Sequence, residues 1–244
     1  MPYGGNDWLD ITKEDIIEPS LPICDPHHHY WDLRVERTPY GRYLLHELLD
    51  DISGHNITST VFIEARAMYN ADIEKDLKPV GEVEFVEGIS AASASGIYGK
   101  SRASASIIGH ANLNLGDRVE PVLQSLLEAS PRRFKGIRHI VAWDTDKEVD
   151  TVPVYNQEEQ MSTKSFIEGA KVLSKMGLSF DSWMYFHQLP QLLNLAKKVP
   201  DLPIMVDHIG GMLLVGKYRD CLLYTSDAAD DTPSVDLGGR RIIK

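Results

Sequence analysis

Short apolar runs alternate along the chain with segments in which apolar residues recur at helical spacing. Six of these runs read as strands, because they are short, rich in β-branched and aromatic residues, and bounded by turn-forming residues. They span residues 21–25, 59–64, 106–112, 134–140, 178–183 and 203–208. Strands that alternate with helices are typical of parallel sheets with helical crossovers. The pattern therefore predicts an α/β protein built from repeated strand–helix units.

Three segments between these strands carry the apolar stripe of a helix that packs on one side. The inward-facing residues are expected to be Val119, Val122, Leu123, Leu126 and Leu127 in the first helix, Phe166, Ile167, Ala170 and Leu173 in the second, and Leu189, Leu192, Leu193, Ala196 and Val199 in the third. Ser162 or Thr163 should cap the second helix, which should end before Gly177. Pro200 should end the third. Residues 88–106, rich in Ala, Ser and Gly, form either a weaker helix or a long active-site loop.

Repeated strand–helix units can form an open doubly wound sheet or a closed eight-unit barrel. An open dinucleotide-binding sheet usually carries Gly-x-Gly-x-x-Gly after its first strand, and this sequence has no such motif there. Chemically capable residues instead end several expected strands: His27, His29, Glu64, Arg138, His139, Asp181 and His208. Barrel enzymes collect catalytic groups from many strand ends on one face. The sequence therefore favours a (β/α)8 TIM barrel, with about six βα units present.

Three consecutive histidines follow the first expected strand. Side chains alternate between the two faces of a strand, so His27 and His29 should point to one side and His28 to the other. Residues 21–24 run into the histidines as a strand does, which favours a paired-imidazole site over a polar turn or a tag remnant.

Composition excludes several classes of protein. The 244 residues are 43% hydrophobic and 25% charged, as in ordinary globular proteins. The net charge of −11 argues against a nucleic-acid or anionic-membrane partner, because phosphate groups would be repelled. Two cysteines, Cys24 and Cys221, cannot build a framework of disulfides, and no stretch of eighteen apolar residues occurs. We expect a cytoplasmic protein that acts on a small-molecule substrate.

Four motifs together resemble one protein family. They are DPHHHYWD at residues 25–32, FIEA at 62–65, FKGIRH at 134–139 and DHIGG at 207–211. They are similar to motifs of the amidohydrolase-related barrel hydrolases, which include sugar-lactone and pyrone-dicarboxylate lactonases, and the similarity runs from about residue 21 to residue 218. The resemblance implies a hydrolase that opens a lactone of a sugar acid or of a pyrone carboxylate with water.

The resemblance also implies which residues carry the chemistry. His27 and His29 match the family's first-strand histidine pair, and His208 matches its sixth-strand histidine. These three are the expected catalytic residues. They would act either directly as hydrogen-bond donors or as ligands of a divalent ion, zinc or manganese, since the family contains both metal-dependent and metal-independent members. The family's water-activating aspartate ends an eighth strand, which this sequence lacks, and Asp207 should not replace it because it should face away from His208.

Five other strand-end residues are expected to contact the substrate. Arg138 could hold a substrate carboxylate or hydroxyl, or form an ion pair with Glu64 or Asp181. Because Arg138 and His139 are neighbours on one strand, only one of them should face the pocket. Glu64 is expected to orient a first-strand histidine or to cap a loop. Trp183 should wall the pocket or lie in the core.

The sequence around the remaining histidines and one tryptophan gives weaker evidence for a functional role. Surface or core positions are expected for His46, His55, His110 and His187, with His110 the strongest exception. Trp31 follows the histidine triplet and could stack on a substrate ring, although tryptophans in barrels are more often part of the core.

The pattern of the chain changes near residue 221. Residues 1–20 read as an N-terminal arm, residues 21–220 as a partial barrel domain, and residues 221–244 show neither helical nor strand periodicity. Residues 221–231 and 235–243 resemble translated transposase-end and adapter sequences from short-read libraries. We therefore expect residues 221–244 to be a non-native, disordered tail that replaces the last units of a truncated barrel.

Two other functions stay open at this stage. A metal-dependent decarboxylase or hydratase can be built on the same barrel, and evolution of carbon dioxide would identify a decarboxylase. Alternatively, the strand-end histidines only fill a polar core in a non-catalytic fragment. In that case, replacing His27 and His29 by asparagine in the intact parent would change neither turnover nor ligand binding.

A barrel without its last two units would leave an open sheet edge and expose apolar surface. We therefore expect the 244-residue chain to be insoluble or inactive when it is expressed alone. Solubility, urea unfolding and lactone hydrolysis measure this directly. Soluble protein that unfolds cooperatively and turns over lactones would contradict both the truncation and the need for the missing aspartate.

Overall fold

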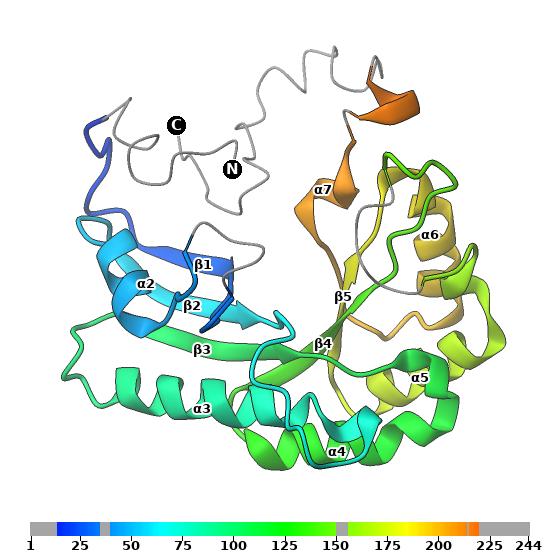
Figure 1. Ribbon diagram of the computed structural model, residues 1–244, viewed down its shortest axis with the longest axis horizontal. Coiled ribbons are helices and arrows are strands. Elements are labelled where there is room, and N and C mark those ends of the chain that lie inside the picture. The colour runs from blue at the N-terminus through cyan, green and yellow to red at the C-terminus, as the bar shows by residue number, and fades with distance from the viewer. Residues whose placement is uncertain (1–13, 35–39, 150–155, 214, 220–244) are drawn as a thin grey trace.

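Six parallel strands form one curled sheet. The structure is a computed structural model that describes residues 14–34, 40–149, 156–213 and 215–219. The strands are hydrogen-bonded in chain order: β1 (Ile23–His28), β2 (Ile57–Ile63), β3 (Arg102–Gly109), β4 (Phe134–Ile140), β5 (Ser179–Trp183) and β6 (Ile204–Val206). The sheet bends into a half-barrel (Figure 1). The prediction of a partial (β/α)8 barrel with about six units is confirmed.

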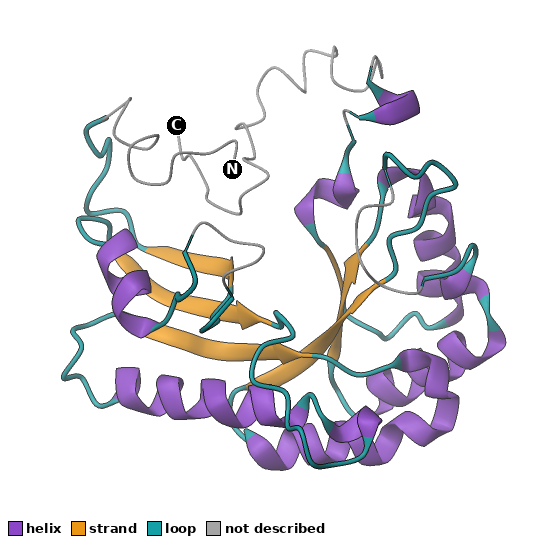
Figure 2. Ribbon diagram, in the orientation of Figure 1, coloured by secondary structure: helices purple, strands orange, loops and turns teal. Residues whose placement is uncertain are grey.

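Helices cover the convex side of this sheet (Figure 2). They are α2 (Leu45–Asp51), α3 (Val80–Ala94), α4 (Glu120–Ala129), α5 (Lys164–Lys175) and α6 (Leu189–Lys198), whereas the short α7 (His208–Gly211) lies at the carboxyl end of the sheet. Short 3₁₀ segments lie at Lys75–Leu77, Leu113–Val119, Gln160–Ser162, Phe186–Gln188 and Gly216–Tyr218. Helices α3 to α6 each join consecutive strands, which is the crossover arrangement that parallel strands require. In the described ranges, no helix is both long and apolar enough to span a bilayer.

The helix-ending signals act where the sequence places them. Thr163, rather than Ser162, is the N-cap of α5, and its hydroxyl accepts a hydrogen bond from the Phe166 amide at 3.3 Å. Gly177 follows the end of α5 with a φ of +72°, a conformation that glycine adopts without a steric penalty. Residues 88–94 belong to α3, so the first part of the ambiguous 88–106 segment is helix, and β3 begins at Arg102.

Two sequence-based expectations about packing and strand length are wrong. In α6 the buried residues are Leu192 and Leu195, whereas Leu189 and Leu193 are exposed, so the helix is rotated relative to the expected stripe. The sixth strand ends at Val206 rather than at residue 208. Beyond it the backbone turns out of the sheet, since residues 208–211 all have positive φ.

The main core lies between the sheet and its covering helices. Its largest fully buried side chains include Phe62, Ile107, Leu123, Phe134, Phe166 and Phe180. Burying such a side chain contributes about 1.5–3 kcal/mol. Strands β4 and β5 approach closely at Gly136, where an added Cβ would lie 2.5 Å from the Ser179 carbonyl oxygen. Glycine at this position therefore allows the pairing that carries Arg138 to the end of β4.

Both edge strands of the described sheet have an open side. No strand in the described residues pairs with the outer edge of β1 or β6. Met205 and Val206 on β6 are exposed. The tail expected at residues 221–244, and the N-terminal arm up to residue 13, lie outside the described residues.

Replacing Gly136 by alanine should destabilise the fold by about 1–3 kcal/mol, because the new methyl group would force β4 and β5 apart. Gly88 provides the matched control, since an added Cβ there meets nothing within 4 Å and α3 should gain about 0.5–1 kcal/mol from alanine. Urea unfolding of both variants measures the difference. Equal unfolding midpoints for Gly136→Ala and Gly88→Ala would contradict the proposed close approach.

Candidate active site

Three predicted histidines meet at the carboxyl end of the sheet. The Nε2 atoms of His27 and His29 are 3.3 Å apart, and the ring centroids of His27 and His208 are 4.8 Å apart. His28 points to the opposite side of β1, where its Nε2 lies 2.8 Å from the Thr60 hydroxyl. Burial lowers the pKa of His28 to about 3. Strand alternation thus separates the paired imidazoles from the buried one, as the sequence predicts.

A backbone carbonyl orients His29. Its Nδ1 lies 2.7 Å from the Ile63 carbonyl oxygen, which can only accept, so Nδ1 carries the proton and Nε2 keeps a lone pair. Burial, followed by the positive charge of Arg138 and the neighbouring His27, holds the pKa of His29 well below its usual range. His29 is therefore a neutral imidazole near pH 7, with its free nitrogen turned toward His27.

Arg138 enters the same site from β4. Its Nε donates to Glu64 Oε1 at 3.0 Å, and its Nη2 donates to the Glu64 carbonyl. Its Nη1 lies 3.5 Å from His27 Nε2 and 3.9 Å from Asp207 Oδ2. The structure therefore pairs the guanidinium with Glu64 and Asp207 instead of Asp181. Because these contacts occupy its guanidinium, Arg138 is less available for a substrate carboxylate than the sequence suggests.

His139, the neighbour of Arg138, faces away from the histidine pair. Its Nδ1 accepts from the Leu113 amide at 3.3 Å, and its ring packs on Phe166 on the helical side of the sheet. The structure thus places Arg138, and not His139, at the site. His110 contacts the backbone of β4, since its Nδ1 lies 3.0 Å from the Arg138 carbonyl oxygen.

Glu64 forms the ion pair with Arg138 that the sequence left open, and it does not orient a first-strand histidine. The carbonyl of the preceding residue, Ile63, orients His29 instead. A backbone acceptor has no signature in the sequence, so residue types could not reveal this partner of His29.

Asp207 lies on the site side of the sheet, which corrects the expectation that it points away. Alternation fails because β6 has already ended at Val206, a break that the following Gly210 and Gly211 signal in the sequence. Burial raises the pKa of Asp207 to about 6 against the opposing effect of Arg138. Burial and the Asp207 carboxylate raise the pKa of Asp181 to about 7. Carboxyl groups with such values can exchange protons near neutral pH.

Trp183 lies beside His208 at the end of β5. Their ring centroids are 6.3 Å apart in an edge-to-face arrangement, and Trp183 is half-buried. Burial and the charge of Arg138 lower the pKa of His208. Trp31 stacks on Tyr43 and donates to the Tyr40 carbonyl at 2.9 Å, so that it packs against the segment preceding α2.

A model of the amidohydrolase family matches residues 24–219. This chain belongs to the amidohydrolase family. It is also 26% identical over 212 residues to the uncharacterized protein y4mH of Sinorhizobium fredii (strain NBRC 101917 / NGR234), a match that covers 78% of this chain and 63% of the relative. The chain therefore spans less than two thirds of that relative.

Two solved structures share the fold of this amidohydrolase chain. A zinc-bound amidohydrolase from Burkholderia multivorans superposes with a TM-score of 0.56 at 18% identity, over 80% of this chain and 61% of the other. A putative 2-pyrone-4,6-dicarboxylic acid hydrolase from Pseudomonas putida gives 0.50 at 12% identity, over 83% and 63%. At these identities the likeness shows the fold alone.

The zinc in the Burkholderia multivorans amidohydrolase raises the question of whether this chain's residues fit a metal. Ligand nitrogens at the usual distance from tetrahedral zinc lie about 3.3 Å apart, and His27 Nε2 and His29 Nε2 are separated by 3.3 Å. The pair thus fits two positions of a zinc site. Across the described ranges, no three His, Cys, Asp or Glu side chains converge as ligands, so His208 does not complete the set.

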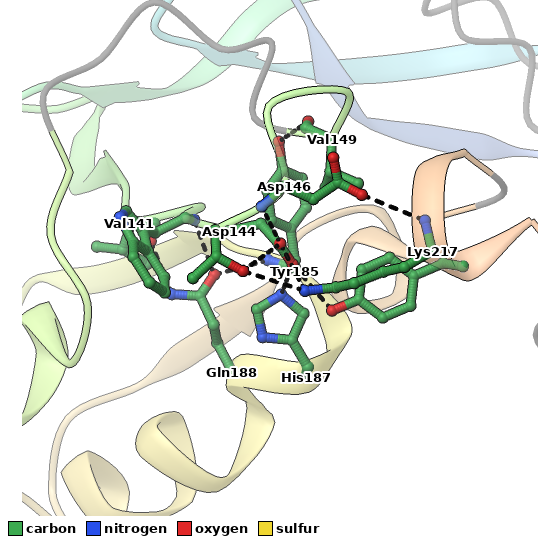
Figure 3. Close-up of polar contacts among 11 residues, drawn as sticks. Val141, Asp144, Asp146, Val149, Tyr185, His187, Gln188 and Lys217 are labelled. Carbon is green, nitrogen blue, oxygen red and sulfur yellow. Dashed lines mark hydrogen bonds and ion pairs between the residues drawn. The ribbon is translucent and has the colours of Figure 1, made fainter.

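A second polar cluster joins the loops after β4, β5 and β6 (Figure 3). Asp144 Oδ1 accepts from Lys217 Nζ at 2.7 Å, and Oδ2 accepts from the Tyr218 hydroxyl at 2.8 Å. His187 Nε2 lies 2.9 Å from the same Oδ2. Burial acts against ionisation, but these hydrogen bonds and one from the Asp146 amide lower the pKa of Asp144 to about 2. No sequence pattern indicates this cluster, because Asp144 and Lys217 are far apart in the chain.

Replacing Asp144 by asparagine should loosen residues 216–218 from the loops after β4 and β5, since Lys217 and His187 lose their anionic partner. We expect tryptic cleavage after Lys217 to become several-fold faster, measured by mass spectrometry of short digests. Asp201→Asn, at an exposed position, is the control. Equal cleavage of both variants would show that Asp144 does not anchor this segment.

In the unmodified chain, the hydrogen bonds of Asp144 to residues 217 and 218 should persist above pH 4 and be lost as the pH falls through about 2, because the pKa of Asp144 is lowered in the folded state.

Proposed function

We propose that the intact parent of this amidohydrolase chain opens a lactone, the cyclic ester of a sugar acid or of a pyrone carboxylate, with water. The observation that carries the proposal is the convergence of His27, His29, His208 and Arg138 from three separate strand ends. Such convergence at the carboxyl end of barrel strands is typical of an active site. The fold relative from Pseudomonas putida supports the choice of reaction, since a 2-pyrone is a cyclic ester.

The imidazoles and the guanidinium provide the polar surface that ester hydrolysis needs. When water adds to a lactone carbonyl, negative charge develops on its oxygen, and fixed N–H donors stabilise that charge. In the proposed reaction, His27 and Arg138, whose nitrogens are 3.5 Å apart, supply donors on one side of the carbonyl. His208, whose ring centroid lies 4.8 Å from that of His27, and the neighbouring Trp183 extend the same surface.

Proton transfer requires a group that is partly ionised at neutral pH. The raised pKa values of Asp181 and Asp207, about 7 and about 6, suit an acceptor of the proton lost by water. We therefore assign this role to the carboxyl pair in the proposed reaction. Alternatively, the Nε2 atoms of His27 and His29 would fill two positions of a zinc site, and His27 would then be a ligand instead of a donor; such an ion would polarise the carbonyl and lower the pKa of water.

Single replacement of His27 or His29 by asparagine should lower lactone hydrolysis about 10²- to 10⁴-fold, the usual loss for a positioned proton-transfer group or electrophile. Acid release in a pH-stat, with sugar lactones and pyrone carboxylates as substrates, measures this in the intact parent, because we expect the 244-residue chain to be inactive alone. His55→Asn, at an exposed position, controls for general effects of histidine loss. Bound zinc is counted by mass spectrometry in the same samples. Unchanged turnover in both site variants, or release of carbon dioxide in place of ring opening, would refute the proposal.

A further inference from the structure

Glu82 is a fully buried carboxyl group that lies outside the candidate active site. It stands in the first turn of α3, and its Oε1 accepts from two backbone amides, Ala65 at 3.0 Å and Ala67 at 2.8 Å. These amides belong to the loop that follows β2. The Oε1 atom of this α3 residue therefore binds two backbone amides of the loop after β2.

The loop that Glu82 holds begins directly after the groups that orient the active site. The Ile63 carbonyl binds His29 Nδ1 at 2.7 Å, and the carboxylate and carbonyl of Glu64 bind Arg138. Ala65, the first residue that Glu82 contacts, is next in the chain. A shift of the loop would move both orienting groups together.

The loop backbone has a conformation that needs external support. Arg66 and Met68 have φ values of +57° and +53°, which are unfavourable for residues with side chains. Helix α3 packs directly against this loop, since a Cβ added at Gly81 would lie 2.7 Å from the Met68 carbonyl oxygen. The Asn70 amide also donates to the Lys78 carbonyl at 3.1 Å. The two hydrogen bonds to Glu82 compensate for the strained backbone at the point nearest the site.

A protonated, neutral Glu82 fits its buried position beside Glu64. Its other oxygen, Oε2, is buried without a hydrogen-bond partner in the described residues, as are Glu64 Oε2 and the Tyr69 hydroxyl. Burial and the Glu64 carboxylate raise the pKa of Glu82 to about 8, against the opposing effect of Arg138. A neutral carboxylic acid still accepts hydrogen bonds through its carbonyl oxygen, and it adds no negative charge that would compete with Glu64 for Arg138.

We propose that Glu82 is a positioning residue, whose hydrogen bonds to Ala65 and Ala67 hold the end of β2 so that Ile63 and Glu64 present His29 and Arg138 to the substrate. It touches neither the substrate nor the histidines. Near neutral pH it acts as the protonated acid. The kinetic consequence of this inference rests on the proposed lactone hydrolysis, whereas its effect on stability does not.

The first test compares the pH dependence of unfolding in the full chain, Glu82→Gln and the control Glu84→Gln, which changes an exposed glutamate of the same helix. An acid whose pKa rises from 4.5 to about 8 on folding holds an extra proton in the folded state between those pH values. The unmodified chain should therefore lose stability relative to Glu82→Gln as the pH rises through this window, by up to about tenfold in the unfolding constant per pH unit. Above about pH 8 the difference should stay constant.

The second test measures lactone hydrolysis by variants of the intact parent, because we expect the 244-residue chain to be inactive alone. Glu82→Gln keeps the accepting oxygen and cannot ionise, so its turnover at pH 7 should stay close to that of the unmodified chain and should not decline above pH 8. Glu82→Leu removes the acceptor, and its kcat should fall about 10- to 100-fold, with a much smaller change in KM, because the misplaced groups act on the transition state.

The two tests separate the failure of this inference from the failure of the proposed function. If no lactone is hydrolysed by any sample, the proposed function fails, and the unfolding measurement still decides the role of Glu82. The inference is overturned if the unmodified chain and Glu82→Gln show parallel pH dependence of unfolding. It is also overturned if Glu82→Gln loses as much turnover as Glu82→Leu. If Glu82→Leu does not fold, the glutamine variant alone decides.

Discussion

The buried ion pair between Arg138 and Glu64 is the interaction on which the site depends. Removing both charges from water is costly, and only good geometry with additional hydrogen bonds offsets that cost. Here the guanidinium also meets the Glu64 carbonyl, His27 and Asp207. One side chain thus links the ends of β1, β2, β4 and β6. In the described residues the sheet does not close on itself, so such cross-strand contacts fix the spacing that a closed barrel would otherwise impose.

The sequence was a good guide to the fold wherever local pattern decides structure. Strand β4 has the predicted bounds, and Thr163 and Gly177 act at the ends of α5 as expected, because caps and alternation depend on neighbouring residues. The prediction was wrong where tertiary packing decides. The orientation of α6, with Leu193 exposed, depends on which neighbours are available to cover it. The early end of β6 depends on a left-handed turn that strand periodicity does not encode.

The side chains of the candidate site were more predictable than the contacts among them. Alternation separates His27 and His29 from His28, and it places Arg138 and His139 on opposite faces. Partners that come from the backbone or from a distant helix leave no such trace. The Ile63 carbonyl, the carboxyl group of Glu82 and the Asp144 cluster became visible only when segments far apart in the chain were placed together. Whether the histidines catalyse a reaction stays a prediction.

The orientation of His29 has an evolutionary consequence. Its Nδ1 is held by the carbonyl oxygen of Ile63, and every amino acid carries that oxygen. Substitution at position 63 can change the packing of β2 without deleting the acceptor. The tautomer of His29 is therefore robust to mutation at position 63. A barrel built in this way can acquire new substrates while His29 keeps the same tautomer and orientation.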